Sequence, residues 1–452
     1  MKSISFFGAS GTVTGSCYQL NRNDKASLLI DYGMYQGTKD IEKLNHISIP
    51  YKPYELDGML LTHAHLDHCG RLPVLLQHGF KQKIYMTEPT RDLLEITLHD
   101  AARIAEKNEA VIPLYTEDDV ELLMGYIEIV DYNQPFELGG FEITYQDAGH
   151  ILGSASLRIV DKQVEDDMKS IIFSGDIGKW PHDLLPNPYL FDEADAVVME
   201  STYGGRLHTN EDPLTFIAEE IHAIERNGGT LLIPSFAIER TQEVLYLIKQ
   251  LKDSGQVKAQ TPVFLDSPMA LHVTEVYKHY GALFNDDFHK IVMAGDPFEF
   301  EGLHKLEKNR QSRIIDKVLG PKVIIAGSGM MSGGRIMKHA VKYLPKESTR
   351  LLFVGYQGDE TPGRLISEGA ETVKIMDFHV QVNAHVSKID SLSAHADEKQ
   401  LLEWLGHING VKHVFLIHGE DVARDAIDPK IQQTGISRIS KPQLNDEILI
   451  KG

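Results

Sequence analysis

Four side chains that can bind a metal lie within six residues, in the segment His63-Ala64-His65-Leu66-Asp67-His68. The segment follows the apolar run GMLLT, which has the composition of a buried strand. Imidazole and carboxylate groups are typical ligands of zinc. Alternation at a strand end can direct His63 and His65 toward one metal, and the turn that follows can direct Asp67 and His68 toward a second. The alternative is a surface histidine cluster without a metal, which fits a position after a buried strand less well.

Three further strand ends supply a histidine and two carboxylates. His150 ends the run YQDAGH, Asp176 lies in IIFSGDIG, and Asp31 lies in LLIDYG. Taken alone, each is more typical of a turn or a helix cap. In the order HxHxDH, His, Asp, we interpret His150 as a third ligand, Asp176 as a bridging carboxylate and Asp31 as a residue that orients a ligand histidine. Two metals about 3.5–4 Å apart activate water and stabilise an oxygen leaving group, so the pattern predicts a hydrolase.

The elements that must position these residues follow two patterns along the chain. In the first part, apolar runs end in polar or Gly-containing turns, FELGGFEITYQDAGH predicts a hairpin that turns at Gly139-Gly140, and a helix is expected over residues 89–109. From residue 207 onward, strand and helix patterns alternate, as in GGTLLIPSF followed by ERTQEVLYLIKQLK. Such alternation is typical of a parallel sheet flanked by helices.

Composition narrows the class of protein. The 452 residues predict two or three domains, and the formal charge of −20 argues against nonspecific binding to nucleic acid. The charge is uneven, because residues 207–391 carry 21 Lys and Arg against 24 Asp and Glu, so this part could present a locally basic groove. Two cysteines exclude a disulfide framework and favour a reducing cytoplasm. No apolar run reaches the ~18 residues of a membrane span, so we expect no membrane association.

Three more motifs complete a recognisable set. They are VVMESTYGGR with Glu200, SLSAHADE with His395, and FLIHGE with His418. Together with HxHxDH they resemble the β-CASP nucleases of the metallo-β-lactamase superfamily, a group that includes the cleavage-and-polyadenylation endonuclease subunit and its bacterial and archaeal relatives. The resemblance implies an α/β fold, namely an αββα metallo-β-lactamase sandwich with an inserted α/β β-CASP domain. The implied divisions are 1–206 and 392–452 for the sandwich and 207–391 for the insertion.

The same resemblance implies a role for each motif residue. It places one metal on His63, His65 and His150, a second on Asp67, His68 and His418, and Asp176 between them together with a hydroxide. The expected cofactor is two zinc ions, with manganese or iron left open. Asp67, Glu200 and His395 are the expected catalytic residues, and a histidine beside a carboxylate suits proton delivery because the opposite charge favours its protonated form. The alternatives are helix capping for Glu200 and a first-turn surface position for His395.

Two Gly-containing segments are candidates for contact with a phosphate. The turn GSGMMSGGR (327–335) leads into a helix and offers Ser328 and Gly329, since backbone N–H groups at a helix start bind anions. The segment GYQGDETPGR ends in Arg364, a second candidate. A purely structural turn is the alternative for both segments.

The motif set predicts a zinc-dependent phosphodiesterase that cleaves RNA internally by attack of a metal-bridging hydroxide, with 5′-exonuclease activity left open. Single-stranded RNA is the expected substrate, and a homodimer or a processing-complex partner is the expected assembly. Two alternatives are a small-molecule hydrolase of the thioesterase or lactonase type on the same fold, and a scaffold without catalysis. The long inserted segment argues against the first, and the complete ligand set argues against the second.

Overall fold

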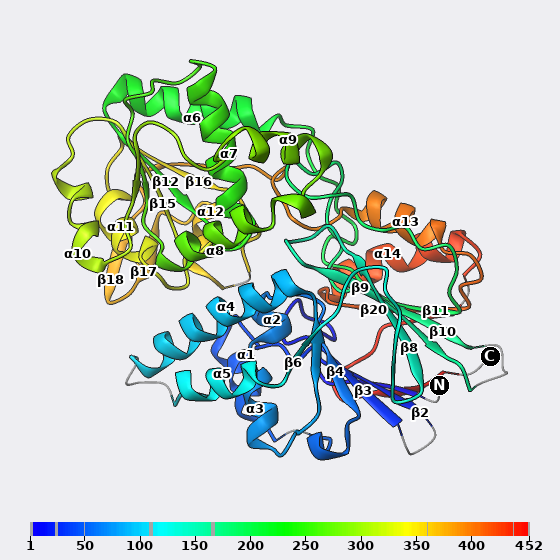
Figure 1. Cartoon of the computed structure of the whole chain (residues 1–452). Coiled ribbons are helices and arrows are strands. Elements are labelled where there is room, and N and C mark those ends of the chain that lie inside the picture. Colours follow the sequence, from blue (N-terminus) through cyan, green and yellow to red (C-terminus); the bar gives the residue numbers. More distant parts are fainter. Residues whose placement is uncertain are drawn as a thin grey trace. The chain divides into compact units, whose positions relative to one another are not determined.

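The computed structural model describes residues 3–22, 26–48, 50–107, 112–163, 168–358, 360–436 and 438–450. The chain separates into two compact units, drawn in Figure 1. The first unit combines Met1–Leu207 with His395–Gly452, and the second is His208–Ala394. The second unit therefore interrupts the first in sequence.

Two sheets of seven strands form the first unit. The first sheet has the order β22 (Glu447–Leu449), β1 (Ser3–Phe6), β2 (Tyr18–Arg22), β3 (Ala26–Ile30), β4 (Gly58–Leu60), β5 (Ile84–Met86) and β6 (Ile127–Ile129). The second has the order β21 (Arg438–Ser440), β20 (His413–Ile417), β11 (Ala196–Glu200), β10 (Ser170–Phe173), β9 (Ala155–Asp161), β8 (Phe141–Asp147) and β7 (Phe136–Leu138). The predicted hairpin is confirmed by the antiparallel pair β7–β8, whose turn holds Gly139 and Gly140 at positive φ.

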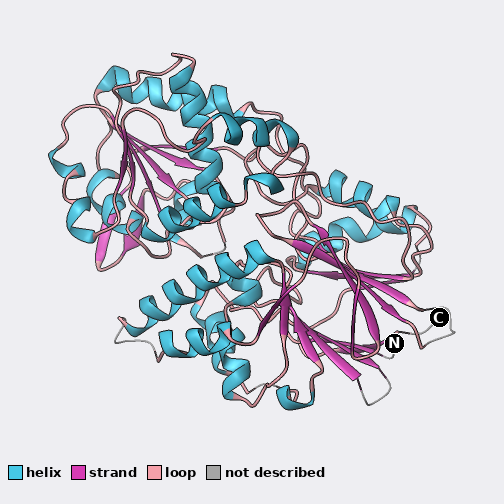
Figure 2. Cartoon of the chain, in the orientation of Figure 1, coloured by secondary structure: helices cyan, strands magenta, loops and turns pink. Residues whose placement is uncertain are grey.

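Apolar side chains from both sheets form one core between them. Phe6, Leu28 and Leu60 of the first sheet pack in a cluster with Phe173 and Phe415 of the second. Helices cover the outer faces, as Figure 2 shows. They are α1 (Lys39–Glu42), α2 (Leu66–Cys69), α3 (Leu72–Gln77), α4 (Glu88–Glu106) and α5 (Glu117–Met124) on the side of the first sheet, and α13 (Glu398–His407) and α14 (Asp421–Gln433) on the side of the second. This order of layers confirms the expected αββα sandwich.

The first and last strands of the chain lie side by side. β1 pairs with β22 in antiparallel register, with Ser3 opposite Leu449. The backbone N–H of Phe6 donates to the carbonyl of Asp446 at 2.9 Å. The C-terminal segment therefore completes the first sheet.

Parallel pairing brings the predicted functional residues to a shared edge. β3 and β4 are parallel neighbours, as are β10, β11 and β20. Because the carboxyl ends of parallel strands meet at one edge of a sheet, the residues that follow these strands lie close together. The predicted residues Asp31, His63, His65, Asp67, His68, His150, Asp176 and His418 thus follow β3, β4, β8, β10 and β20, and Glu200 is the last residue of β11.

The second unit is built on a parallel sheet, as the sequence predicts. Its order is β14 (Leu303–Lys305), β13 (Val263–Leu265), β15 (Lys322–Ala326), β12 (Thr230–Pro234), β16 (Thr349–Phe353) and β19 (His385–Lys388), and all adjacent pairs are parallel. The helices are α6 (Pro213–Asn227), α7 (Arg240–Asp253), α8 (Pro268–His279), α9 (Asp286–Ala294), α10 (Asn309–Ser312), α11 (Ile336–Tyr343) and α12 (Pro362–Ser367). Among the described residues, no helix has the length and apolar character needed to cross a bilayer.

A small hairpin in the second unit was not predicted from the sequence. It pairs β17 (Thr372–Ile375) with β18 (Phe378–Gln381). Met376 occupies its turn with φ +55°, a conformation that favours Gly or Asn. The turn therefore lacks the residue types by which a hairpin is normally recognised.

Candidate metal centre

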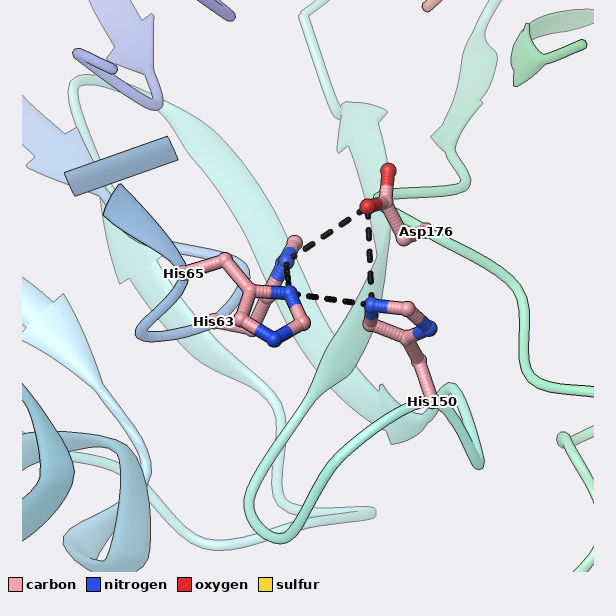
Figure 3. Close-up of side chains that lie close together, drawn as sticks. All are labelled: His63, His65, His150 and Asp176. Atoms are coloured by element: carbon pink, nitrogen blue, oxygen red, sulfur yellow. Dashed lines mark hydrogen bonds and ion pairs between the residues drawn. The ribbon is translucent and has the colours of Figure 1, made fainter. Parts of the chain in front are cut away.

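Three histidines and one carboxylate oxygen converge in the first unit, in the arrangement that Figure 3 shows. His65 Nδ1 lies 3.1 Å from both His63 Nε2 and His150 Nε2. Asp176 Oδ2 lies 3.6 Å from the same two Nε2 atoms. His63 and His65 come from the loop after β4, His150 from the loop after β8, and Asp176 from the loop after β10. We call these four residues the first cluster.

A second group gathers around the other oxygen of Asp176. His68 Nε2 lies 3.2 Å from His418 Nε2 and 3.3 Å from Asp176 Oδ1. Asp67 Oδ2 lies 3.3 Å from His418 Nε2. We call Asp67, His68 and His418 the second cluster. Since each oxygen of Asp176 faces a different cluster, its carboxylate joins the two.

Burial and charge set the protonation of these groups. Burial lowers the pKa of His65 to about 4, and it lowers the pKa of His63 well below its usual value. Burial also lowers the pKa of His68, but the carboxylates of Asp176 and Asp31 outweigh it and raise the pKa well above its usual value. Burial opposes ionisation of Asp176, yet His418 and His68 hold its pKa well below the usual range. His63 and His65 therefore present neutral nitrogens, whereas a metal that binds His68 must displace a proton.

Asp31 fixes the tautomer of a histidine in each cluster. Asp31 Oδ1 accepts the backbone N–H of Thr62 at 2.8 Å, and Oδ2 accepts the Thr62 hydroxyl at 2.9 Å. His68 Nδ1 lies 2.7 Å from Oδ2 and must donate to it, because a carboxylate only accepts. The Thr62 hydroxyl uses its one hydrogen in the bond to Asp31. Toward His63 Nδ1, which lies 3.0 Å away, it therefore acts as the acceptor. His63 Nε2 therefore has its lone pair directed at the first cluster, and His68 Nε2 presents one to the second cluster once a metal has displaced its proton.

Backbone hydrogen bonds hold the short helix α2 that carries Asp67 and His68. Tyr32 N–H donates to the carbonyl of His68 at 2.8 Å, and Ser16 N–H donates to that of Asp67 at 2.8 Å. A Cβ on Gly33 would lie only 1.5 Å from the Asp67 carbonyl oxygen, so this close approach requires glycine.

Two residues of the centre hold backbone conformations that are uncommon outside glycine. Asp31 has φ +57° and His418 has φ +44°. The backbone N–H of His418 donates to Ala9, whose φ is +48°, at 2.8 Å. Such conformations persist only where the surroundings enforce them and are frequent at functional sites.

Glu200 and His395 form a pair beside the first cluster. Glu200 is fully buried, and its Oε1 accepts the backbone N–H of Ile177 at 2.7 Å and faces His395 Nδ1 at 3.1 Å. Burial lowers the pKa of His395, but the charge and hydrogen bond of Glu200 outweigh it and raise the pKa to about 9. The His395 ring lies 4.5 Å from that of His150, so a protonated imidazole stands next to the candidate metal ligands.

The structure also identifies polar residues that sequence reasoning missed. Thr62 links Asp31 to His63, Ser16 Oγ lies 3.3 Å from His68 Nε2, and Thr202 Oγ1 lies 3.1 Å from His418 Nδ1. Tyr18 lines a cavity of about 10 Å³ under the second cluster, which has room for about one water. For Thr62, the position directly before His63 was the available signal, and Thr202 lies in the VVMESTYGGR motif two residues after Glu200. Ser16 and Tyr18 lie outside the quoted motifs.

The phosphate candidates of the second unit have defined roles within their own loops. Ser328 Oγ accepts the backbone N–H groups of Ser332 at 3.1 Å and Gly333 at 3.2 Å. Gly329 packs against Phe236, where a Cβ would lie 2.5 Å from the ring. Arg364 donates to Glu368 at 2.5 Å. The turn therefore has an internal structural function, and contact with a phosphate stays a prediction.

The donor set fits divalent metal ions of the zinc type. Ligand atoms that each lie about 2.0–2.1 Å from a tetrahedral zinc are about 3.3 Å apart. The separations between neighbouring donor atoms in the first cluster are 3.1–3.6 Å. The neighbours of the buried Asp176 Oδ1 are two candidate ligands, His68 Nε2 at 3.3 Å and His418 Nδ1 at 3.5 Å, as expected of an oxygen that shares a cation with them.

Comparison with family models divides the chain into three matched segments. Residues 11–202 match the metallo-β-lactamase superfamily, and residues 241–366 match the β-CASP domain. Residues 379–440 match a zinc-dependent metallo-hydrolase RNA specificity domain.

Curated relatives align over most of the chain. A ribonuclease of Thermus thermophilus is 36% identical, with 92% of each chain covered. An RNase J-like protein of Methanocaldococcus jannaschii is 32% identical, again with 92% of each chain covered. A transcription termination factor of Methanococcus maripaludis is 31% identical over 92% of this chain and 66% of its own length. A crystal structure of a protein of unknown function from Enterococcus faecalis has the same fold, with a TM-score of 0.54, 12% identity, and coverage of 99% of this chain and 100% of that one.

Proposed function

We propose that this chain, which belongs to the β-CASP ribonucleases of the metallo-β-lactamase superfamily, is a metal-dependent ribonuclease that cuts single-stranded RNA within the strand. One observation carries the proposal. Two clusters of metal-binding side chains share Asp176, and the protonated His395 stands beside them on Glu200. Both features suit phosphodiester cleavage, because this reaction creates negative charge on phosphate oxygens and expels an alkoxide that takes up a proton.

The proposed cofactor is two zinc ions. His63, His65 and His150 would hold one, Asp67, His68 and His418 the other, and Asp176 both. Bound metal supplies water activation and positive charge beside the phosphate oxygens. Elemental analysis of the metal-replete protein should find close to two zinc ions per chain, and Asp67→Ala should lower the content toward one. A content of at most one in the wild type would contradict the two clusters.

The chain's own residues supply the remaining chemistry. His395 is proposed to give its proton to the departing oxygen, and Glu200 keeps that proton in place and orients the imidazole through Nδ1. Asp31 keeps the lone pair of His68 Nε2 directed at the second cluster. Asp176 balances positive charge between the clusters while its own carboxylate stays ionised.

RNA is the proposed substrate in preference to DNA. The names of the ribonuclease relatives and the match to an RNA specificity domain support this choice. The motif residue His418 supports it further, since RNA-processing members of the resembling family carry histidine at this position. Whether 5′-exonuclease activity accompanies internal cutting is open to the same experiment.

Domain division and assembly also belong to the proposal. The proposed domains are 1–206 with 392–452, and 207–391, supported by the two compact units.

A cytoplasmic location is supported by two buried free cysteines, Cys17 and Cys69. A homodimer or a processing-complex partner is proposed from the resemblance alone, and light scattering of the purified protein would decide the oligomeric state.

The test uses two RNAs of one sequence, labelled at the 3′ end and either blocked or free at the 5′ end, and a DNA of the same sequence. Wild-type protein with zinc should cut the blocked RNA internally, and Asp67→Ala should not. Faster cutting of the DNA would overturn the substrate assignment. Products from the unblocked RNA only would replace internal cutting with exonuclease action. Hydrolysis of thioesters or lactones without RNA cleavage would favour the small-molecule hydrolase, and two bound metals without any hydrolysis would favour the scaffold.

A further inference from the structure

A cationic segment stands out in an otherwise acidic chain. Residues 303–350 carry eleven Lys and Arg against three Asp and Glu, whereas the whole chain has a formal charge of −20. Eight of these cations are exposed. They are Lys305, Lys308, Arg310, Arg313, Lys317, Lys338, Lys342 and Lys346.

Two stretches of this segment are bonded side by side. Near the start of α11, the buried carboxylate of Asp266 accepts from Arg335 Nη1 at 2.7 Å, His339 Nε2 at 2.7 Å and Ser312 Oγ of α10 at 2.8 Å. Near the end of α11, Lys342 forms an ion pair with Asp316 of the 3₁₀ helix η4 (Ile315–Lys317). Figure 1 shows α10 beside α11. The exposed cations of 310–317 and 338–346 therefore share one surface, which we call the basic face.

Helical spacing concentrates the lysines. Lys338 and Lys342 are four residues apart, so they project from the same side of α11, and Lys346 follows after four more. Lys342 and Lys346 both lie against the Tyr343 ring, at 5.5 and 4.7 Å from its centroid. The buried Lys322 Nζ lies 6.0 Å from the same ring.

These charges repel one another and have few acidic neighbours. Burial, and then the positive charges of Lys346 and Lys342, lower the pKa of Lys322. In the part of the chain that the structure describes, no carboxylate lies within ion-pair distance of Arg310, Arg313, Lys317, Lys338 or Lys346. A polyanion laid across the face would relieve this repulsion and release its own counterions.

We infer that the basic face, formed by α10, η4 and α11, binds the phosphate backbone of the RNA that the enzyme cleaves. The inference rests on the proposed ribonuclease function. The face continues along α11 from the turn 327–335, whose Ser328 and Gly329 are candidates for phosphate contact. Tyr343, the aromatic residue at its centre, is 3% exposed and offers no surface on which a base could stack. The face therefore contacts phosphates without reading the base or the 2′-hydroxyl.

The test is a triple variant, Lys338→Gln, Lys342→Gln and Lys346→Gln, with Lys249→Gln, Lys258→Gln and Lys290→Gln as a control of equal charge. The control lysines lie on or next to α7 and α9 of the same unit. Binding of a long single-stranded RNA is measured by fluorescence anisotropy at several salt concentrations, in the Asp67→Ala background that prevents cleavage. Each lost contact with a single strand lowers the salt slope by ~0.7, which is about 5-fold in affinity at 0.1 M salt.

The triple variant should therefore bind RNA up to about 100-fold more weakly, with a salt slope smaller by about 2. DNA of the same sequence should lose as much, and the control variant should match the parent. In the cleavage-competent protein, KM for long RNA should rise, whereas hydrolysis of bis(p-nitrophenyl) phosphate should not change.

Wild-type binding and salt slope in the triple variant would overturn the inference and leave the ribonuclease proposal intact. If the triple variant lost binding of polyglutamate but kept its RNA binding, the basic face would instead be a binding site for an acidic protein. Absence of RNA cleavage by the wild type would refute the proposed function separately.

Discussion

Asp31→Asn removes a negative charge that touches no candidate metal position, yet it should weaken metal binding. The aspartate accepts three hydrogen bonds: the Thr62 N–H on Oδ1, and the Thr62 hydroxyl and His68 Nδ1 on Oδ2. Asparagine has one acceptor oxygen and one NH₂ group, so it cannot satisfy all three donors. With its oxygen toward Thr62 N–H, the NH₂ group faces His68 Nδ1 at 2.7 Å, and that nitrogen must become an acceptor.

The His68 proton then moves to Nε2, which faces the second cluster. With the amide in the opposite orientation, two donors face each other at the 2.8 Å contact with Thr62 N–H. Loss of such a partner of a metal-ligating histidine typically reduces metal affinity about 10- to 100-fold. This loss corresponds to about 1.4–2.8 kcal/mol.

Competition with a chromophoric chelator measures the affinity, and circular dichroism of each variant checks that it is folded. The loss should fall mainly on the second cluster, so Asp31→Asn should cost much less metal affinity in an Asp67→Ala background than in the wild type. Thr62→Val is the matched control: it keeps the contact between Asp31 and His68 but removes the acceptor of His63 Nδ1. It should therefore weaken the first cluster and spare the second. Two metals bound to Asp31→Asn with wild-type affinity would refute the tautomer argument.

Three further outcomes are expected. Glu200→Gln and His395→Ala should leave metal content unchanged and slow RNA cleavage about 10²- to 10⁴-fold. The loss on bis(p-nitrophenyl) phosphate should be smaller, because its leaving group needs no proton. Equal losses on both substrates would remove His395 from proton delivery. Acidification should release metal from the second cluster before the first, because the pKa of His68 is raised and that of His65 is lowered to about 4. Metal content measured after gel filtration at falling pH tests this order. Simultaneous loss of both metals would contradict it. Burial raises the pKa of Asp147 to about 7 despite a hydrogen bond from Gly149, so the folded state favours the neutral acid and loses stability as the pH rises from about 4 to 7. Asp147→Asn should therefore raise the melting temperature at pH 8 but not at pH 4, and an unchanged difference between the two would be the contrary result.

Individual elements and the parallel sheet of the second unit were predictable because their signals are local, whereas the αββα sandwich and the insertion were expected from the resemblance to a family. Strand runs that end in turns, the Gly139-Gly140 hairpin and the strand–helix alternation each depend on nearby residues, and the structure has all three. The hairpin β17–β18 escaped prediction because Met376 stands where its turn favours Gly or Asn. The basic face was expected only as an uneven charge, since the bonds that align α10 and η4 with α11 join residues distant in sequence.

The candidate site was predictable where a motif marked it and otherwise not. Glu200 and His395 are 195 residues apart, and only the resemblance to a family placed them together. Thr62, Ser16 and Thr202 act through hydroxyl groups that no spacing rule distinguishes from other turn residues. Their contribution depends on where β3, β4 and β11 end relative to one another, which is a property of the folded sheets.

Asp67 and His418 lie 351 residues apart, and the last strand of the chain pairs with the first. At about 5–20 residues per second, a ribosome needs about 20–70 s to synthesise the stretch between them. For that interval the emerging polypeptide already contains the HxHxDH segment but lacks both the last member of the second cluster and the strand that closes the first sheet. The order of the chain thus places completion of the second cluster after synthesis of the whole inserted unit, so a polypeptide that is still emerging from the ribosome holds the HxHxDH segment without its last partner.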